Sequence, residues 1–160
     1  MSRSDVIKEL KNYFQIYELV GPDVYRKHGD NAWFVFRTET LHCLLIMRKG
    51  INKSFTVNTW FWDGIYDERG YRSNIQPIVE EKTLDGILYV SGHPLGCAFD
   101  YKVKDMSSDL VREWIIKNAA SFPCKIRLEN INISKGRSIS WVHFDTKYYE
   151  QNPKVYLFNV

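Results

Sequence analysis

The sequence has little of what marks disulfide-rich or membrane-spanning proteins. Its only cysteines are Cys43, Cys97 and Cys124, whose odd number and wide spacing argue against a disulfide framework. No Cys-x-x-Cys pair is present, so a cysteine zinc site is not indicated either. The longest apolar stretches, such as 41–47, are far too short to cross a bilayer. Residues 1–14 are charged throughout and contain no apolar leader, so we expect synthesis in the cytoplasm without a secretory signal.

Charge of one sign is also scarce. The formal net charge is +3, and the basic residues are scattered rather than gathered into a run or a stripe. We therefore expect no binding to nucleic acid. A charge this small supports only a weak attraction to anionic polymers, including those of cell walls.

The sequence does contain the material for a core. Apolar residues make up 44% of the 160 residues and aromatic residues 15%, which suits a single folded domain over 1–160. We expect this domain to begin with a helical segment over 1–13, to end in a tail over 147–160, and to be a monomer.

The spacing of apolar residues predicts the elements of this domain. Helices are expected over 4–14, 32–49 and 107–122. Strands are expected over 54–60, 96–103, 124–131, 139–149 and 155–160. The strands at 124–131 and 139–149 should form a hairpin around a turn at 134–138, whereas glycine and proline make 63–90 a loop with short elements. Helices followed by strands around one embedded helix predict an α+β fold with a small, mainly antiparallel sheet and flanking helices.

The segment SGHPLGCAFD, residues 91–100, has two interpretations. Its glycines permit a tight turn into an ordinary core strand. The same turn would bring Asp100 back beside His93 as two ligands of one metal ion. Spacing alone favours the ordinary turn.

A third candidate ligand, His143, lies in the strand-like stretch WVHFD. Alternation places Trp141, His143 and Asp145 on one face of that strand, either as a solvent-facing surface or as the floor of a polar site. Two imidazoles and one carboxylate form a ligand set that suits zinc and leaves a fourth position open.

Three segments together resemble the M15 peptidases. Residues 91–100 match the family pattern Ser-x-His-x-x-Gly-x-Ala-x-Asp at every specified position. GYRS at 70–73 resembles the segment that precedes this motif in the family, and SWVHFD at 140–145 resembles the strand that carries the third ligand. The resemblance covers roughly residues 14–146. The family includes zinc D-alanyl-D-alanine carboxypeptidases, dipeptidases and phage L-alanyl-D-glutamate endolysins. These share a fold with the hedgehog signalling domain.

The resemblance implies roles for matching residues. His93, Asp100 and His143 would hold one zinc ion, and Arg72 would stabilise the oxyanion or bind a substrate carbonyl. Glu129 is assigned as the base because no other acidic residue lies between the helix at 107–122 and His143. The assignment departs from many relatives, since fourteen positions separate Glu129 from His143. Further residues expected to contact the ligands or the substrate are Ser91, Trp141, Asp145, Tyr71 and Ser73.

The function implied is zinc-dependent hydrolysis of an amide bond in the peptide stem of bacterial peptidoglycan. The enzyme would be of the D,D-carboxypeptidase or L-alanyl-D-glutamate endopeptidase type. The stretches FQIYELVGP at 14–22 and VNTWFWDG at 57–64 resemble the phage branch of the family, which favours an endolysin that acts on the cell wall. The alternative is a non-catalytic zinc-containing binding module or virion structural module on the same fold.

Overall fold

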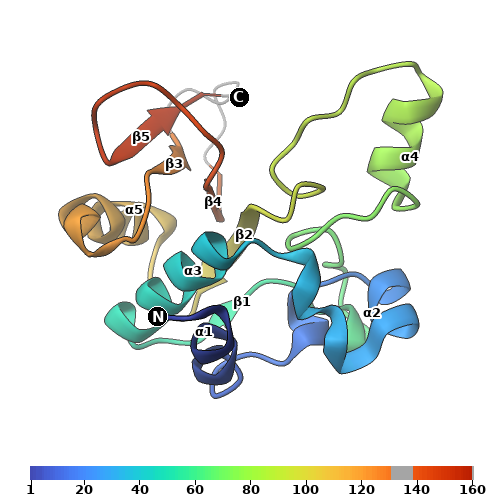
Figure 1. Ribbon diagram of the computed structural model, residues 1–160, viewed down its shortest axis with the longest axis horizontal. Helices are drawn as coiled ribbons and strands as arrows, with labels where there is room; N and C mark the ends of the chain where they lie inside the picture. The colour runs from blue at the N-terminus through green and yellow to red at the C-terminus, as the bar shows by residue number, and fades with distance from the viewer. Residues whose placement is uncertain (131–138, 160) are drawn as a thin grey trace.

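The computed structural model describes residues 1–130 and 139–159, which form helices around one open sheet (Figure 1). The α-helices are α1 (Arg3–Leu10), α2 (Pro22–His28), α3 (Thr38–Ile51), α4 (Pro77–Leu84) and α5 (Ser108–Lys117). The strands are β1 (Phe55–Thr56), β2 (Ala98–Val103), β3 (Ile126–Glu129), β4 (Val142–Asp145) and β5 (Val155–Phe158). Short 3-10 helices are η1 (Ile16–Glu18), η2 (Gly29–Val35), η3 (Trp60–Trp62) and η4 (Ala119–Ser121). The predicted α+β class is confirmed.

The sheet has the strand order β1-β2-β4-β3-β5. Every neighbouring pair is antiparallel except β3 and β5, which are parallel, so the prediction of a mainly antiparallel sheet is also confirmed. The expected pairing of the strands within 124–131 and 139–149 is present as β3 and β4. Their predicted turn at 134–138 lies outside the described residues.

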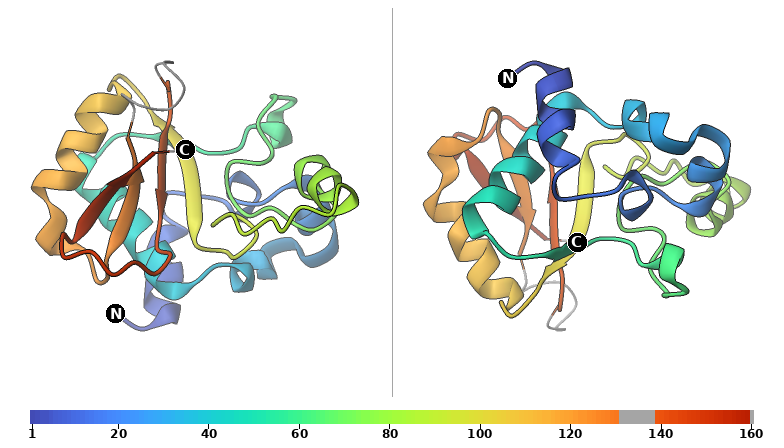
Figure 2. Two further views of the ribbon diagram at one scale, coloured as in Figure 1. Left: turned by 90° about the horizontal axis from the view of Figure 1, so that it is seen from above. Right: turned by 90° about the horizontal axis from the view of Figure 1, so that it is seen from below.

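One face of the sheet forms the core with helices α3 and α5 (Figure 2). Phe99 and Tyr101 on β2 lie opposite Phe144 and Val142 on β4, and all four are buried. The Tyr101 hydroxyl donates to Sδ of Met47 on α3 at 3.2 Å. Because side chains alternate along a strand, the residues between these project from the opposite face, which carries the polar groups.

The helix predicted over 32–49 is wrong in its first third. Residues 29–35 form the 3-10 helix η2, and the α-helix begins only at Thr38. The chain is extended at Phe36, whose ring stacks on Phe99 at 4.9 Å between centroids. Arg3 donates to the carbonyl oxygens of Trp33 and Phe36 at 2.8 and 2.9 Å, which gives these carbonyl groups at the end of η2 a hydrogen-bond partner. Tertiary contacts thus interrupt a segment whose composition favours one continuous helix.

Other predicted boundaries also shift. The strand expected over 54–60 is only two residues long, because the amides of Asn58 and Thr59 donate to the carbonyls of Glu18 and Tyr66 rather than to a neighbouring strand. The first helix is capped by Ser2, since Oγ of Ser2 accepts from the amide of Asp5 at 3.2 Å. Ser107 caps α5, because its Oγ accepts from the amide of Leu110 at 3.3 Å.

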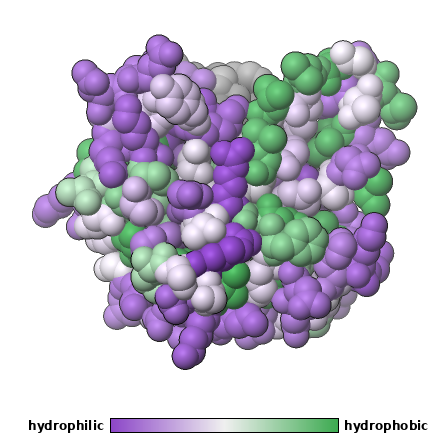
Figure 3. All heavy atoms as spheres, viewed as in Figure 1, coloured by the Kyte–Doolittle hydropathy of each residue, from purple (hydrophilic) through white to green (hydrophobic). Residues whose placement is uncertain are grey.

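Helix α4 lies within the segment predicted to be mostly loop and stands at the opposite end of the molecule from α5 (Figures 1 and 2). Apolar side chains gather on the surface over α4 and the segment after it (Figure 3). Leu84 and Leu88 are 81% and 85% exposed. None of the helices in the described ranges is long and apolar enough to cross a bilayer.

Candidate metal centre

The polar face of the sheet carries a row of three acid–base side chains on neighbouring strands. Asp100 on β2 lies directly opposite His143 on β4. On β3, Arg127 pairs with Asp145 and Leu128 with Phe144, and continuing this register by one residue places Glu129 opposite His143. Cross-strand partners project to the same face, so Asp100, His143 and Glu129 lie side by side.

The loop before β2 adds His93 to this row. The amide of Cys97 donates to the carbonyl of Gly92 at 2.9 Å, and that of Gly96 to the carbonyl of His93 at 3.1 Å, which closes a tight turn. Gly96 has a φ of 65°, and a Cβ there would lie 1.9 Å from the carbonyl oxygen of Val35. Only glycine fits this conformation and this contact.

Small residues also let the loop lie close to the sheet. A Cβ on Gly92 would lie 2.8 Å from Cβ of Ala98 and 3.2 Å from Cβ of Asp145. Gly92 therefore passes directly over β2 and β4, and His93, the next residue, comes down beside Asp100. The tight turn into a core strand is therefore present, and the same turn brings His93 and Asp100 together as two candidate ligands of one metal ion.

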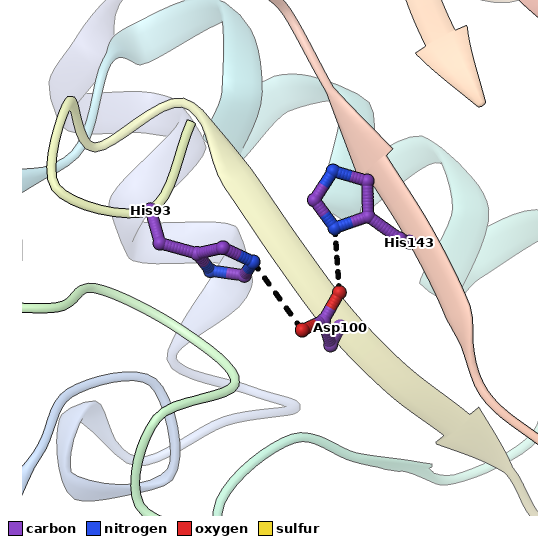
Figure 4. Close-up of side chains that lie close together, drawn as sticks. All are labelled: His93, Asp100 and His143. Atoms are coloured by element: carbon purple, nitrogen blue, oxygen red, sulfur yellow. Dashed lines mark hydrogen bonds and ion pairs between the residues drawn. The ribbon is translucent and has the colours of Figure 1, made fainter. Parts of the chain in front are cut away.

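His93, Asp100 and His143 converge as Figure 4 shows. Nε2 of His93 lies 3.3 Å from Oδ2 of Asp100, and Nδ1 of His143 lies 2.6 Å from Oδ1 of the same carboxylate. One ligand atom from each residue lies within 4.8 Å of the other two, so the group could hold a metal ion. His93 and Asp100 are 2% and 8% exposed, so water competes little with their contacts.

The outer nitrogen of each imidazole has its own partner. Nδ1 of His93 lies 2.7 Å from the carbonyl oxygen of Gly70 and donates to it, which leaves Nε2 directed at Asp100. Nε2 of His143 lies 3.4 Å from Oδ2 of Asp145, and Arg127 holds both oxygens of that carboxylate at 2.8 and 2.7 Å. Histidines that bind metals are oriented in this way, so the donor set and its surroundings fit a metal ion.

Burial and charge together set the ionisation of the group. Burial lowers the pKa of His93, which favours the neutral imidazole that a metal ion requires. Burial alone would raise the pKa of Asp100, but its interactions with the imidazoles of His93 and His143 outweigh burial and hold that pKa well below its usual range. Burial also opposes charge on His143, yet the carboxylate of Asp100 raises the pKa of His143 to about 9. Asp100 is therefore an ionised carboxylate that attracts a cation.

Arg72 is fixed beside this carboxylate. Its Nε donates to the carbonyl of Glu68 at 2.7 Å and its Nη1 to the hydroxyl of Tyr89 at 2.6 Å. Its Nη2 lies 3.6 Å from Oδ2 of Asp100. These contacts hold the guanidinium in one position next to the predicted ligands.

Two hollows flank the group. The arginine hollow, of about 220 Å³, is lined by Ile65, Tyr66, Asp67, Glu68, Arg69, Arg72, Asp100 and Trp141. The glutamate hollow, of about 180 Å³, is lined by Ser91, Gly92, Arg127, Glu129, His143, Asp145, Lys147 and Phe158. Asp100 borders the first hollow and His143 the second, so the candidate ligands lie between them.

Glu129 lies at the end of β3 and is 7% exposed. Nε of Arg112 donates to its carbonyl oxygen at 2.9 Å, and the amide of the next residue, Asn130, donates to the carbonyl of Phe158 on β5 at 2.8 Å. The backbone that carries this carboxylate is thus held by α5 and by β5. The pairing of β3 with β4 places Glu129 beside the predicted third ligand despite their separation in the sequence.

The remaining predicted residues fall into two groups. Ser91 borders the glutamate hollow and its Oγ accepts from the amide of His93 at 3.5 Å, while Trp141 borders the arginine hollow. Tyr71 and Ser73 line neither hollow. The ring of Tyr71 meets that of Phe36 edge-on at 6.2 Å, and Oγ of Ser73 donates to Oδ2 of Asp23 on α2.

Sequence reasoning missed several residues of the centre. Arg127 precedes Glu129 by two positions, so the alternation of β3 already placed it on the same face. Tyr89 had no signal in the sequence. Gly70 belongs to the GYRS segment, but nothing there indicated the role of its carbonyl, because only the folded chain brings these groups to Arg72 and His93.

A comparison of this chain with protein-family models, with curated proteins and with solved structures finds no match.

Proposed function

We propose that this protein is a zinc-dependent peptidase of the M15 type, with a hedgehog-like fold, that hydrolyses an amide bond in the peptide stem of bacterial peptidoglycan. One observation carries the proposal. The ligand atoms of His93, Asp100 and His143 lie within 4.8 Å of one another, between a hollow bordered by Arg72 and a hollow bordered by Glu129. A metal-binding group flanked by a cation and a second carboxylate is the arrangement that metal-assisted hydrolysis requires.

Zinc suits two imidazoles and one carboxylate, and when bound it polarises a carbonyl and lowers the pKa of a water molecule to about 7. The side chains that would hold it are those of His93, Asp100 and His143. Asp145 keeps the imidazole of His143 in place, and the carbonyl of Gly70 does the same for His93.

The other residues supply the proton transfer and the charge stabilisation. The carboxylate of Glu129 takes a proton from the attacking water and passes it to the leaving amine. Arg72, held by Glu68 and Tyr89, donates hydrogen bonds to the negative charge that develops on the scissile carbonyl oxygen. The ring of Trp141 offers the substrate an apolar wall in the arginine hollow.

The choice of substrate follows from the resemblance of the three segments to peptidases of the cell wall. We propose an endolysin-type enzyme of a phage or prophage, made in the cytoplasm and active on the wall as a monomer. A D,D-carboxypeptidase would use the same groups on the terminal bond of the stem.

Digestion of purified peptidoglycan tests this function. The zinc-loaded wild type should release new amino groups, and Glu129→Gln should lower the rate by about 10²–10⁴-fold because the general base is lost. Glu150→Gln makes the same change at an exposed glutamate and should keep the wild-type rate. Zinc content measured in parallel should be the same for all three proteins.

The outcomes separate the parts of the proposal. A wild-type rate in Glu129→Gln would show that another group is the base. A zinc-loaded wild type that cleaves none of several wall chemotypes would contradict the peptidase function, and binding to walls without cleavage would favour a binding module.

A further inference from the structure

Arg69 is a second arginine in the arginine hollow, and the proposed chemistry does not use it. Its guanidinium carbon lies 3.4 Å from the ring centre of Tyr66 and 6.0 Å from that of Trp141. Both rings are within the range of cation–π attraction, so they define the position of the guanidinium in the hollow.

The backbone of Arg69 is tied to the metal centre. Its amide donates to Oδ1 of the buried Asn58 at 3.0 Å, and its carbonyl accepts from the amide of Asp100 at 2.7 Å. A group bound by Arg69 would therefore lie at a fixed distance from the ligand Asp100.

One donor of this side chain has no acceptor. Nη1 of Arg69 is buried and has no hydrogen-bond partner within residues 1–130 and 139–159. A buried cationic donor without an acceptor is costly, so such groups in native proteins usually meet a ligand or a water molecule. A carboxylate, whose two oxygens match the fork of a guanidinium, is the best partner for it.

The other charged residues that line the hollow do not supply this acceptor or compete for the ligand. Arg72 is held by Glu68, Tyr89 and Asp100. Asp67 and Glu68 also line the hollow, but in the described part of the chain neither forms an ion pair with Arg69. Their nearby negative charge means that a ligand carboxylate must be held by direct hydrogen bonds rather than by the general field.

We propose that Arg69 binds a carboxylate of the substrate in the arginine hollow. This inference rests on the proposed function, because it names the chemical group by which that same site recognises a stem peptide. The carboxylate has two possible sources, the carboxyl terminus of the stem or the α-carboxylate of its γ-linked D-glutamate. The enzyme would then reject stems in which that one group is an amide.

Calorimetric titration of zinc-loaded protein with four synthetic stem pentapeptides tests the inference. The peptides combine a free or amidated carboxyl terminus with D-glutamate or D-isoglutamine. The titrations use the Glu129→Gln background, in which cleavage is expected to be slow, and compare Arg69→Gln, Arg69→Lys and Arg48→Gln. Arg48, on helix α3, is the matched control. Its guanidinium also lies over a tyrosine ring, that of Tyr13 at 4.6 Å, but it does not line the arginine hollow.

The parent protein, Glu129→Gln with Arg69 intact, is the reference protein. At one of the two positions it should bind the peptide with a free carboxylate at least about tenfold more tightly than the amidated peptide, since a charge-assisted hydrogen bond is worth that much. Whichever position shows the preference identifies the source of the carboxylate. Arg69→Gln should abolish the preference and change the affinity for the amide by less than about twofold. Arg69→Lys keeps the charge but loses the fork and should retain only part of the preference, whereas Arg48→Gln should retain all of it.

Equal binding of acids and amides by the reference protein would overturn the inference, as would a preference that survives Arg69→Gln or no measurable binding of any free acid. Unchanged zinc content and melting temperature show that a variant is folded, and if Arg69→Gln fails this check, Arg69→Lys decides. Because the readout is binding, it is separate from the function test. Cleavage without carboxylate preference rejects only this inference, and carboxylate preference without cleavage rejects only the peptidase function.

Discussion

At the scale of single residues, Asp145 connects the predicted ligands to the rest of the sheet. Burial would raise its pKa, but the hydrogen bonds of Arg127 outweigh burial and hold the pKa of Asp145 at about 2. Its carboxylate also contacts Nε2 of His143 at 3.4 Å. We expect Asp145→Asn to weaken zinc binding by about 10–100-fold, because the amide cannot satisfy both partners as the carboxylate does.

Competition with a chromophoric chelator measures this affinity. Asp85→Asn makes the same change at an exposed residue after α4 and should bind zinc like the wild type. Unchanged zinc affinity in Asp145→Asn would mean that this carboxylate does not orient the imidazole.

At the scale of elements, the loop of residues 92–97 decides whether His93 meets the sheet. Gly96→Ala and Gly86→Ala both place alanine at a positive φ, 65° and 69°, but only the new Cβ at 96 would meet another group, the carbonyl of Val35 at 1.9 Å. We expect Gly86→Ala to cost about 1 kcal/mol of unfolding free energy for the backbone conformation. Gly96→Ala should cost about 1–3 kcal/mol more through overpacking and should also weaken zinc binding.

Urea denaturation of the two variants measures the difference. Equal losses of stability would contradict the close approach of this loop to the segment before α3.

The elements also show what the sequence could and could not predict. Helix α5 and strands β2, β3 and β4 were predictable because their apolar spacing agrees with the face that each one buries. The break between η2 and α3 was not, because it depends on Arg3 and on the stacking of Phe36 with Phe99, both distant in sequence. The approach of Glu129 to His143 depended on strand register, which no spacing motif encodes.

At the scale of the whole molecule, the candidate ligands come from a loop and two strands that pair across the sheet, so a bound metal ion should stabilise the complete fold. Free zinc at about 100-fold above its dissociation constant should add about 2.7 kcal/mol to the free energy of unfolding. His143→Ala should abolish this zinc-dependent gain, whereas His42→Ala, on α3, should keep it.

Thermal unfolding with zinc and with a chelator measures the gain. An equal rise in melting temperature in His143→Ala would place the stabilising metal elsewhere.

The strand order has a consequence for how this protein is made. In the sheet β4 lies between β2 and β3, although both precede it along the chain, and β5 then pairs with the outer side of β3. A nascent chain that has been translated only as far as β3 therefore has no partner strand for β3, and Asp100 has not yet met His143. The metal centre is therefore assembled late, after β4 has left the ribosome and paired with β2 and β3, which are synthesised before it.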